Sequence, residues 1–485
     1  MELADSSLLK TRAYVGGQWI DADDGSRFAV TNPATGKVVA EVARCGGDET
    51  RRAIDAAEHA QVDWRQRTAG ERSILMRRWF DLMMEHQEDL AQILTAEQGK
   101  PLAEARGEIA YGASYIEWFA EEAKRLYGDV IPPPANDRRI VVIKQPVGVV
   151  ACITPWNFPN AMLARKVAAA LAAGCTTVCK PATATPLSAL AMAELAERAG
   201  IPAGVINIIA GQTGAIGDEL TSNPVVRKLT FTGSTEVGKQ LVEQCAGTMK
   251  RTSMELGGNA PFIVFDDADL DNAIQGTLAS KYRNAGQTCV CANRILVQDS
   301  VMEEYSEKLA EAVQELRVGN GADEGVTIGP LIDNAAADNV CAMIDDAVEK
   351  GAKVVRGGGR SKLGGSFVEP TILSGVTSDM RVFREEIFGP VSPLVGFSTE
   401  EEAIAIANDT EFGLAAYFCA RDVGRIWRVA EGLEYGIIGI NEGIISNAMA
   451  PFGGVKESGN GREGSKYGLD DYVEIKYLCI GGIDR

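Results

Sequence analysis

The alternation of hydrophobic and polar positions divides the chain into a helical N-terminal part and two later series of strands and helices. Between residues 47 and 127, apolar side chains such as Leu75, Trp79 and Leu82 recur at steps of three and four, with Arg and Glu between them. This spacing predicts amphipathic helices packed on a core. Residues 126–146 then contain two short β-prone runs separated by prolines, which predict a hairpin that reaches away from its own domain.

After the hairpin, short β-branched runs alternate with helical stretches. Strands are predicted at residues 147–154, 176–180, 205–209 and 228–232. Helices are predicted at residues 161–173 and 187–199 and from residue 235 to Cys245. Continuous apolar strands of this kind are buried on both faces of a parallel sheet. The alternation therefore predicts a doubly wound, Rossmann-type α/β sheet, which binds ligands at the carboxyl ends of its strands.

A second α/β series follows residue 257. Strands are predicted at 261–265 and 295–299, and helices at 270–282, 301–316, 338–350 and 399–407. The glycine-rich residues 357–365 predict a surface loop, because no helix follows them. Near the C-terminus, YVEIKYL at residues 472–478 alternates strictly, which predicts a late strand paired with the hairpin or with another subunit.

Composition narrows the class of protein. The chain has 485 residues, too many for one core, and its 46% hydrophobic and 24% charged residues are those of a globular protein. A net charge of −19, without any run of Lys or Arg, argues against nucleic acid and anionic membranes as partners. No apolar run is long enough to span a membrane, and no signal peptide is visible.

Cysteine and histidine usage restricts the chemistry further. The ten cysteines are scattered and lack the CxxC spacing of metal sites, so we expect reduced thiols and a cytoplasmic protein. The two histidines, His59 and His86, lie in the helical N-terminal part without any motif around them. A Cys–His hydrolase or a histidine metal site is therefore not expected, and no metal is predicted.

The candidate chemistry lies in KYRNAGQTCVCANR, residues 281–294. This polar segment contains Cys289 and Cys291, and Glu255 precedes it in MELGGN. A cysteine thiolate is a strong nucleophile, and a nearby carboxylate can act as a general base. Taken alone, such a pair more often indicates a buried structural cysteine and a solvated glutamate. The spacing of Gly233 and Gly238 after the strand at 228–232 is not GxGxxG, so it is a weak nucleotide signal.

Seven ordered motifs together resemble the aldehyde dehydrogenase superfamily. They are TPWNFP (154–159), KPAT (180–183), FTGSTEVG (231–238), MELGGNAPFIVFDDADLD (254–271), GQTCVCANR (286–294), EEIFGP (385–390) and PFGGVKESGNGREG (451–464). YRNAGQTCVC, NEGIISN and REGSKYG further resemble the succinate-semialdehyde dehydrogenases, with the glutarate-semialdehyde dehydrogenases as near neighbours.

The resemblance implies a domain organisation. It gives a dinucleotide-binding domain at 1–125 and 147–256, a catalytic domain at 257–455, and a small β oligomerisation element at 126–146 and 456–485. A homo-oligomer, either a dimer or a tetramer, is expected.

The resemblance also implies a reaction. Cys289 attacks the aldehyde, Asn157 and the backbone N–H of Cys289 receive the oxyanion, and hydride transfer to a nicotinamide leaves a thioester. Glu255 then activates the water that releases the acid.

A cofactor site follows from the same resemblance. It is implied to contain Ile153, Thr154, Trp156, Lys180, Thr183, Gly233, Ser234, Leu256, Glu386 and Phe388. Many NAD-specific relatives have a glutamate at the position of Thr183, where a carboxylate would repel a 2′-phosphate. Thr183 beside Lys180 leaves room and a donor for that phosphate. We therefore expect NADP, and the use of NAD remains open.

The implied substrate is a small carboxylated aldehyde. Arg165, Arg283 and Ser446 match positions that hold the carboxylate in the semialdehyde branch, although a solvent-facing Arg165 is the alternative. Succinate and glutarate semialdehydes differ by one methylene, worth about 1–3 kcal/mol, so both remain candidates. An aminoaldehyde enzyme would instead present carboxylates and aromatics. A catalytically idle, crystallin-like relative would not need Asn157, Glu255 and Cys289 together.

Cys291 suggests sensitivity to oxidation. In an extended segment, Cys289 and Cys291 would place their α-carbons about 6.6 Å apart with side chains on one face. A disulfide can bridge that distance with some movement of the loop, and Cys291 could resolve a sulfenic acid on Cys289. The alternative is that Cys291 is a small buried packing residue.

Overall fold

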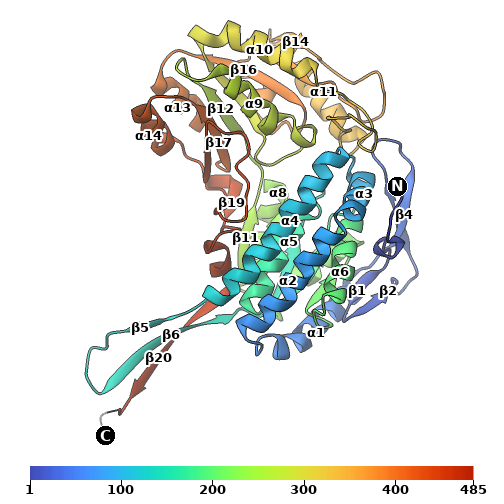
Figure 1. The fold of residues 1–485 in the computed structure, drawn as a ribbon, viewed down its shortest axis with the longest axis vertical. Helices are drawn as coiled ribbons and strands as arrows, with labels where there is room; N and C mark the ends of the chain where they lie inside the picture. Colours follow the sequence, from blue (N-terminus) through green and yellow to red (C-terminus); the bar gives the residue numbers. More distant parts are fainter. Residues whose placement is uncertain (484–485) are drawn as a thin grey trace.

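The computed structural model describes residues 1–483, so the last two residues of the expected 456–485 segment lie outside the described part. Two lobes, each built on its own sheet, lie side by side, and a narrow three-stranded arm projects from one of them (Figure 1). The predicted α/β architecture with a small β element is therefore confirmed.

The first sheet has eight strands in the order β19-β11-β10-β7-β8-β9-β1-β2. Its parallel centre comprises β7 (Val149–Ile153), β8 (Thr176–Lys180), β9 (Ile206–Ile208), β10 (Val226–Thr232) and β11 (Arg251–Glu255). The edges comprise β1 (Ala13–Val15), β2 (Gln18–Ile20) and the antiparallel β19 (Gly459–Asn460). The central strands β7, β8, β9 and β10 confirm the prediction, whereas the central strand β11 was not predicted. The strands at both edges were not predicted.

Helices cover both faces of this sheet, because its central strands are apolar on both sides. Val150 and Cys152 of β7 belong to a core with α2 (Ala69–Glu85), α3 (Gln87–Gln98), α4 (Leu102–Glu122), α5 (Ala161–Ala173) and α6 (Leu187–Arg198). Ala151 and Ile153 point to the opposite core with α1 (Gly47–Trp64), α7 (Thr213–Ser222) and α8 (Thr235–Ala246). Strict alternation along the strand sends successive side chains to opposite faces.

The second sheet has seven strands in the order β14-β15-β16-β13-β12-β17-β18. They are β12 (Ala260–Val264), β13 (Ala292–Gln298), β14 (Lys353–Arg356), β15 (Thr371–Ser374), β16 (Val391–Phe397), β17 (Ala415–Cys419) and β18 (Ile437–Ile440). The accompanying helices are α9 (Leu270–Lys281), α10 (Met302–Gln314), α11 (Asn334–Glu349), α12 (Arg381–Arg384), α13 (Glu400–Asn408) and α14 (Val423–Gly432). The glycine-rich residues 357–365 form a connection between β14 and β15, as predicted.

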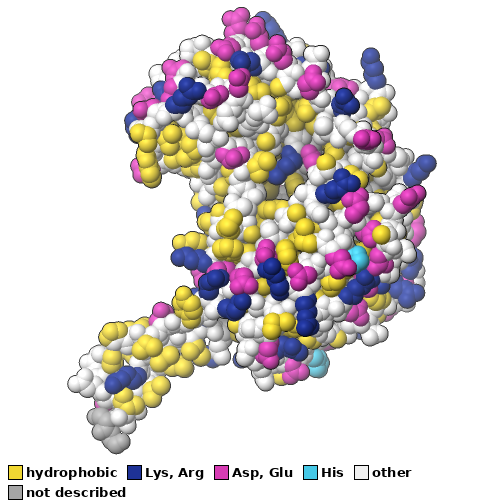
Figure 2. Space-filling model, in the orientation of Figure 1, with side chains coloured by type: hydrophobic (Ala, Val, Ile, Leu, Met, Phe, Trp, Pro, Cys, Tyr) yellow, Lys and Arg dark blue, Asp and Glu magenta, His cyan; other side chains and the backbone are white. Residues whose placement is uncertain are grey.

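The projecting arm pairs the hairpin with the C-terminal strand. β20 (Val473–Gly481) lies antiparallel to β6 (Arg138–Pro146), which pairs with β5 (Asp129–Ile131). The predicted late strand and its pairing with the hairpin are confirmed. Apolar side chains cover much of the arm in Figure 2, and Val130 and Ile475 are 79% and 71% exposed.

A small hairpin, β3 (Arg27–Thr31) and β4 (Val38–Ala43), completes the N-terminal part. Across residues 1–483, no helix has both the length and the apolar character required to cross a membrane.

Candidate active site

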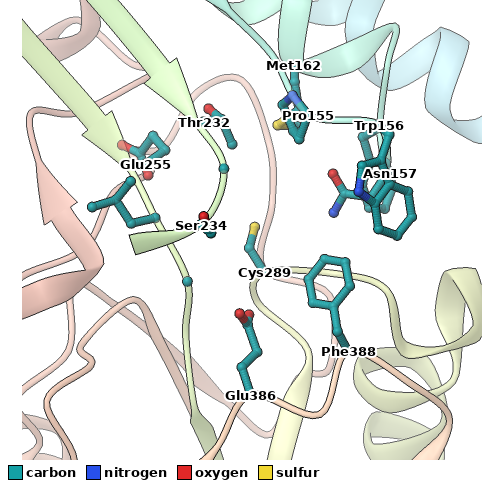
Figure 3. Close-up of a pocket in the computed structure, with 14 residues that line it drawn as sticks. Pro155, Trp156, Asn157, Met162, Thr232, Ser234, Glu255, Cys289, Glu386 and Phe388 are labelled. Carbon is teal, nitrogen blue, oxygen red and sulfur yellow. The ribbon is translucent and has the colours of Figure 1, made fainter. Parts of the chain in front are cut away.

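A cavity of about 240 Å³ lies between the two lobes and contains the candidate nucleophile. Its wall comprises Pro155, Trp156, Asn157, Phe158, Met162, Thr232, Gly233, Ser234, Glu255, Leu256, Gly257, Cys289, Glu386 and Phe388. Figure 3 shows Glu255, Thr232 and Ser234 on one side of Cys289, with Trp156 and Asn157 on the other. The structure therefore brings Cys289, Glu255 and Asn157 to one cavity, as the sequence predicted.

Cys289 lies in a constrained connection between α9 and β13. Asn284 and Ala285 adopt left-handed backbone angles, with φ of 53° and 54°, which are costly for residues with a side chain. The Asn284 amide holds this conformation by donating to the backbone oxygens of Asn157 (3.0 Å) and Gln287 (3.1 Å). The Cys291 N–H closes a turn on the Thr288 oxygen at 2.9 Å. The cysteine is thus held by contacts that reach the first lobe.

The Cys289–Cys291 segment is not extended, so that part of the sequence interpretation is wrong. Cys289 is in a turn, and only Cys289 lines the cavity. The Cys291 thiol instead donates to the backbone oxygen of Lys281 at 3.3 Å. Local hydrogen bonding to Thr288 and Lys281 overrides the extended geometry, and the two sulfurs do not share one face.

Burial controls the protonation of Cys289. It raises the pKa of the thiol to about 12, while the charges of Arg165 and Arg283 act in the opposite direction. Thiolate formation therefore depends on these cations and on proton acceptors that reach the cavity.

Asn157 is positioned from both lobes. Its amide nitrogen donates to the Gln287 oxygen at 3.0 Å, and its backbone oxygen accepts from Lys100 at 2.8 Å. The amide lies on the side of the cavity that faces Cys289 (Figure 3). An amide held in this way can donate a second hydrogen bond to an oxygen formed at the cavity centre.

Glu255 ends β11, and both of its carboxyl oxygens are buried without a hydrogen-bond partner among residues 1–483. Burial and then Glu463 raise its pKa well above the ordinary value, against the charges of Arg165 and Lys166. Gly453 lies against this carboxyl, because an added Cβ would approach Oε1 to 2.9 Å. The site of Gly453 thus requires glycine for space as well as for its φ of 154°.

Arg165 does not line the cavity that contains Arg283. Its guanidinium is 2.6 Å from Glu463, and Lys166 pairs with the same carboxylate at 2.6 Å. The Arg165 guanidinium also lies 4.0 Å from the centroid of the Phe452 ring. The alternative of a solvent-facing Arg165 is wrong, since the residue is 1% exposed.

Arg283 and Ser446 do come together, in a second cavity of about 270 Å³. Its other lining residues are Glu104, Gly107, Glu108, Tyr111, Phe158 and Ile444. Phe158 lines both cavities, and its ring lies 5.5 Å from the Arg283 guanidinium. A molecule with an anionic group at Arg283 and a carbonyl at Cys289 would pass Phe158.

Six of the ten predicted cofactor residues line the first cavity: Trp156, Gly233, Ser234, Leu256, Glu386 and Phe388. The Trp156 and Phe388 rings form an edge-to-face pair, with centroids 5.6 Å apart. Glu386 accepts from the Gly258 N–H at 3.1 Å, and burial raises its pKa to about 7. Ser234 caps α8, whose N-terminus is suited to a phosphate.

The other four predicted cofactor residues are located at or near the carboxyl ends of β7 and β8. Ile153 ends β7 and Thr154 follows it, while Lys180 ends β8. Thr183 is exposed and lies 3.4 Å from the Thr213 hydroxyl, at the start of α7. Burial lowers the pKa of Lys180 to about 8. The donors, the helix N-terminus and the aromatic pair fit a dinucleotide along this edge of the sheet.

Several residues of the site were not predicted. Glu463 lies within the motif PFGGVKESGNGREG, and Lys166 directly follows Arg165, but nothing in either segment of the sequence indicates a buried ion pair. Phe158 belongs to TPWNFP, and its double role depends on two cavities that meet at one ring.

Comparison with known proteins agrees with this geometry. Residues 19–478 match the model of the aldehyde dehydrogenase family. The chain is 63% identical over 481 residues to succinate-semialdehyde dehydrogenase (NADP(+)) GabD of Escherichia coli (strain K12), covering 99% of this chain and 100% of that one. It is 62% identical over 483 residues to glutarate-semialdehyde dehydrogenase of Pseudomonas aeruginosa, covering 100% of both.

Among solved structures, succinate-semialdehyde dehydrogenase from Burkholderia pseudomallei superposes with a TM-score of 0.98 at 60% identity. That match covers 99% of this chain and 100% of the other. A family model that spans nearly the whole sequence, together with relatives above 60% identity, identifies the family. This chain belongs to the aldehyde dehydrogenase family.

Proposed function

We propose that the protein oxidises succinate semialdehyde, or the closely related glutarate semialdehyde, to the dicarboxylic acid with NADP and water. The observation that carries this proposal is the placement of Arg283 and Ser446 in a cavity that shares Phe158 with the cavity of Cys289. The names of the relatives from Escherichia coli and Pseudomonas aeruginosa, at 63% and 62% identity, support the same pair of substrates.

The reaction begins at Cys289. Its sulfur attacks the aldehyde carbon to form a C–S bond, and the carbonyl oxygen becomes an oxyanion. Asn157 Nδ2 and the Cys289 N–H donate to that oxygen, and one such donor contributes about 3–4 kcal/mol to the transition state. The thiol proton leaves in the field of Arg165 and Arg283, which favour the thiolate.

Release of the acid requires water. Glu386 and Phe388 would hold the nicotinamide of a bound cofactor, which would supply the hydride acceptor and so would leave the substrate as a thioester on Cys289. Glu255 accepts a proton from a water molecule that attacks the thioester carbon, the C–S bond breaks, and the sulfur recovers a proton. Burial and Glu463 raise the pKa of the Glu255 carboxyl well above its ordinary value, which makes its ionised form a stronger base, while Arg165 and Lys166 act in the opposite direction.

Lys180, Thr183 and the N-terminus of α8 at Ser234 would hold the adenosine end and the phosphates. Glu386 and Phe388 would lie at the nicotinamide end. A neutral Thr183 close to a cationic Lys180 supports NADP over NAD, because a 2′-phosphate needs donors and no carboxylate. The relative with NADP(+) in its name supports this choice.

Arg283 and Ser446 would bind the substrate carboxylate. A desolvated carboxylate needs hydrogen-bond donors, and the Arg283 guanidinium and the Ser446 hydroxyl would supply them. Arg165, which we also expected in the clamp, would act from behind the cavity as a second cation, since its guanidinium is engaged by Glu463.

The arm supports the proposal of a homo-oligomer, a dimer or a tetramer. The strands β20 and β5 expose apolar side chains to solvent, namely Ile475, Tyr477 and Val130. Such exposure is unusual for a sheet that no other chain covers.

The proposed domains remain residues 1–125 with 147–256, residues 257–455, and the 126–146 and 456–485 element. β19, within that last element, pairs with β11 of the first sheet.

Ten free cysteines support a reducing cytoplasmic location.

One assay tests the proposed function. Formation of NADPH is followed with succinate semialdehyde, glutarate semialdehyde, butanal and 4-aminobutanal at matched concentrations, and then with NAD in place of NADP. The proposal requires a much higher kcat/KM for the carboxylated aldehydes than for butanal. Preference for the aminoaldehyde would support the aminoaldehyde alternative, and no turnover of any aldehyde would support an idle structural relative.

A further inference from the structure

A buried ion pair between Lys100 and Glu108 adjoins the segment that carries Asn157. Lys100 precedes α4, and Glu108 lies in the second turn of that helix. The Lys100 ammonium is 2.5 Å from a Glu108 carboxyl oxygen, and both side chains are 1% exposed. Desolvation of two charges costs about as much as their attraction returns, so such a pair is poor evidence of a purely stabilising role.

The other contacts of Lys100 are with the site itself. Lys100 Nζ donates to the Asn157 backbone oxygen at 2.8 Å and lies 3.8 Å from the centroid of the Phe158 ring. An ammonium group has three N–H donors, and Glu108, the Asn157 oxygen and the Phe158 ring provide one acceptor for each. Lys100 therefore contacts two consecutive residues of the site, and the first of them is the candidate oxyanion donor.

Glu108 holds the same segment at its other end. Its second carboxyl oxygen accepts from the N–H groups of Asn160 and Ala161 at 3.0 and 3.2 Å, where α5 begins. The helices α4 and α5 approach each other closely here, because a Cβ at Gly112 would collide with the Asn160 side chain. The ion pair thus fixes both ends of residues 157–161.

The Asn157 amide depends on this support, because its side chain is held at one atom. Its Nδ2 donates to the Gln287 oxygen at 3.0 Å, whereas its Oδ1 has no hydrogen-bond partner among residues 1–483. The Asn157 backbone oxygen, by contrast, accepts from Lys100 at 2.8 Å and from Asn284 at 3.0 Å. Lys100 belongs to the first lobe, and Asn284 belongs to the connection that carries the nucleophile. These two bonds fix the backbone of Asn157 relative to the nucleophile.

We propose that Lys100, anchored by Glu108, positions Asn157 so that its amide can donate to the oxyanion formed at Cys289. Lys100 lines neither of the two cavities, so it is a positioning residue for the first step of the reaction. The inference rests on the proposed function, in particular on the roles of Cys289 and Asn157, and it names the group that holds the oxyanion donor. A displaced donor makes a weaker hydrogen bond to the oxyanion, and the loss falls on the transition state.

The test is a cycle of three variants: Lys100→Met, Asn157→Ala and the combination of both. Met removes the ammonium group and keeps most of the length of the side chain. Formation of reduced cofactor is followed by stopped-flow absorbance, with enzyme in excess of aldehyde and saturating cofactor, so that the rate constant reports on a single turnover. The aldehyde is the one that wild type oxidises best.

Arg72→Met is the matched control. Arg72 is another buried cation, and it donates to the Ala172 oxygen at 3.2 Å, near the opposite end of α5. This variant should lower the thermal midpoint without changing the rate constant. Circular dichroism and cofactor binding, measured by fluorescence titration without aldehyde, establish that each variant is folded. Cofactor affinity should be unchanged in Lys100→Met.

Asn157→Ala should lower the rate constant by about 100- to 1,000-fold, the cost of losing one oxyanion donor. Lys100→Met should lower it by about 10- to 100-fold in the wild-type background, the range expected for a misplaced catalytic group. In the Asn157→Ala background, Lys100→Met should lower it by less than about threefold, because the donor that Lys100 positions is already absent.

An equal loss from Lys100→Met in both backgrounds would overturn the inference, since Lys100 would then not act through Asn157. An unchanged rate constant in Lys100→Met would overturn it as well. A normal rate constant in Asn157→Ala would refute the oxyanion role of Asn157, and the inference would fall with it. The choice of substrate and cofactor is decided separately by the aldehyde panel. If Lys100→Met does not fold, Glu108→Gln replaces it in the cycle, because Gln keeps an acceptor for the α5 N–H groups and removes the charge that anchors Lys100.

Discussion

Arg165 and Glu463 form a buried ion pair, with 2.6 Å between the guanidinium and the carboxylate and side-chain exposures of 1% and 5%. Arg165 lies on α5, and Glu463 comes almost 300 residues later, after β19. In this arrangement a protein carboxylate already neutralises Arg165. Arg283 has no ion pair among residues 1–483, so it is the cation available to a substrate carboxylate.

The two arginines should therefore give different phenotypes. Arg283→Ala should lower kcat/KM for succinate semialdehyde by about 30-fold or more, because a desolvated charge pair broken on one side costs about 2–5 kcal/mol. Butanal oxidation should change little. Steady-state kinetics with both aldehydes checks this, with Arg283→Lys as the control that keeps the charge. Equal losses on both aldehydes would mean that Arg283 is structural.

Arg165→Ala should instead impair both aldehydes and the fold. Removing the guanidinium leaves Glu463 buried beside Glu255 with Lys166 as its remaining ion-pair partner, and breaking a buried pair costs about 3–5 kcal/mol. We expect a lower thermal midpoint and a loss of butanal oxidation. The double variant Arg165→Met/Glu463→Met should recover part of the midpoint. If only the oxidation of the carboxylated aldehyde is lost, Arg165 binds the substrate carboxylate.

Substitutions of Cys289 and Glu255 should separate the formation of the thioester from its hydrolysis. Cys289→Ala should abolish turnover while cofactor binding, measured by fluorescence titration, stays intact. Glu255→Gln should release a single-turnover burst of reduced cofactor and then stop at the thioester, because the water is no longer activated. Rapid-quench kinetics and intact mass detect the burst and the acyl group. Normal aldehyde oxidation by Cys289→Ala would contradict the assignment.

Thr183 should set the cofactor preference. Thr183→Glu places a carboxylate near the start of α7, where it would repel a 2′-phosphate and accept from a ribose hydroxyl. The KM for NADP should rise far more than the KM for NAD. Thr183→Gln, which has nearly the same size without the charge, is the matched control. An equal rise for both cofactors would show that the adenosine end is recognised elsewhere.

Glu386 should make stability depend on pH in a defined window. Burial raises its pKa from an ordinary value of 4.5 to about 7, so the folded state binds more protons than the unfolded state between these values. The contribution of this carboxyl to stability is therefore present below pH 4.5 and is lost as the pH rises to 7. Glu386→Gln mimics the protonated form and should gain thermal midpoint relative to wild type across that window. A constant difference between the two proteins would show that Glu386 ionises normally.

The arm should mediate assembly. Ile475→Asp puts a charge on an apolar face of β20, so sedimentation velocity should show a shift toward monomers. Lys476→Asp, on the opposite face of the same strand, changes charge without removing apolar area and is the matched control. If the mass in solution does not change with Ile475→Asp, the exposed apolar side chains of the arm do not hold subunits together.

The hydrophobic pattern alone determined the order and type of the central elements. β7, β8, β10 and their helices follow from β-branched runs that alternate with amphipathic stretches, because local periodicity reports which faces are buried. The edge strands β1, β2 and β19 escaped prediction because strands of two or three residues show little periodicity. The strands β3, β4, β11 and β14 to β18 were not predicted either. Motif residues such as Cys289, Glu255 and Asn157 were identifiable because each lies in a distinctive segment.

Only the tertiary structure decided which groups these residues meet. Arg165 is paired with Glu463 because α5 and the segment after β19 pack together, a contact that no local pattern encodes. Cys291 turns toward Lys281 because the hydrogen bond from its N–H to the Thr288 oxygen forms a turn, where an extended segment was predicted. Ion pairs depend on partners that are distant in sequence, and turn geometry depends on competing hydrogen bonds. Both kinds of contact form only when the chain folds, so local sequence patterns do not reveal them.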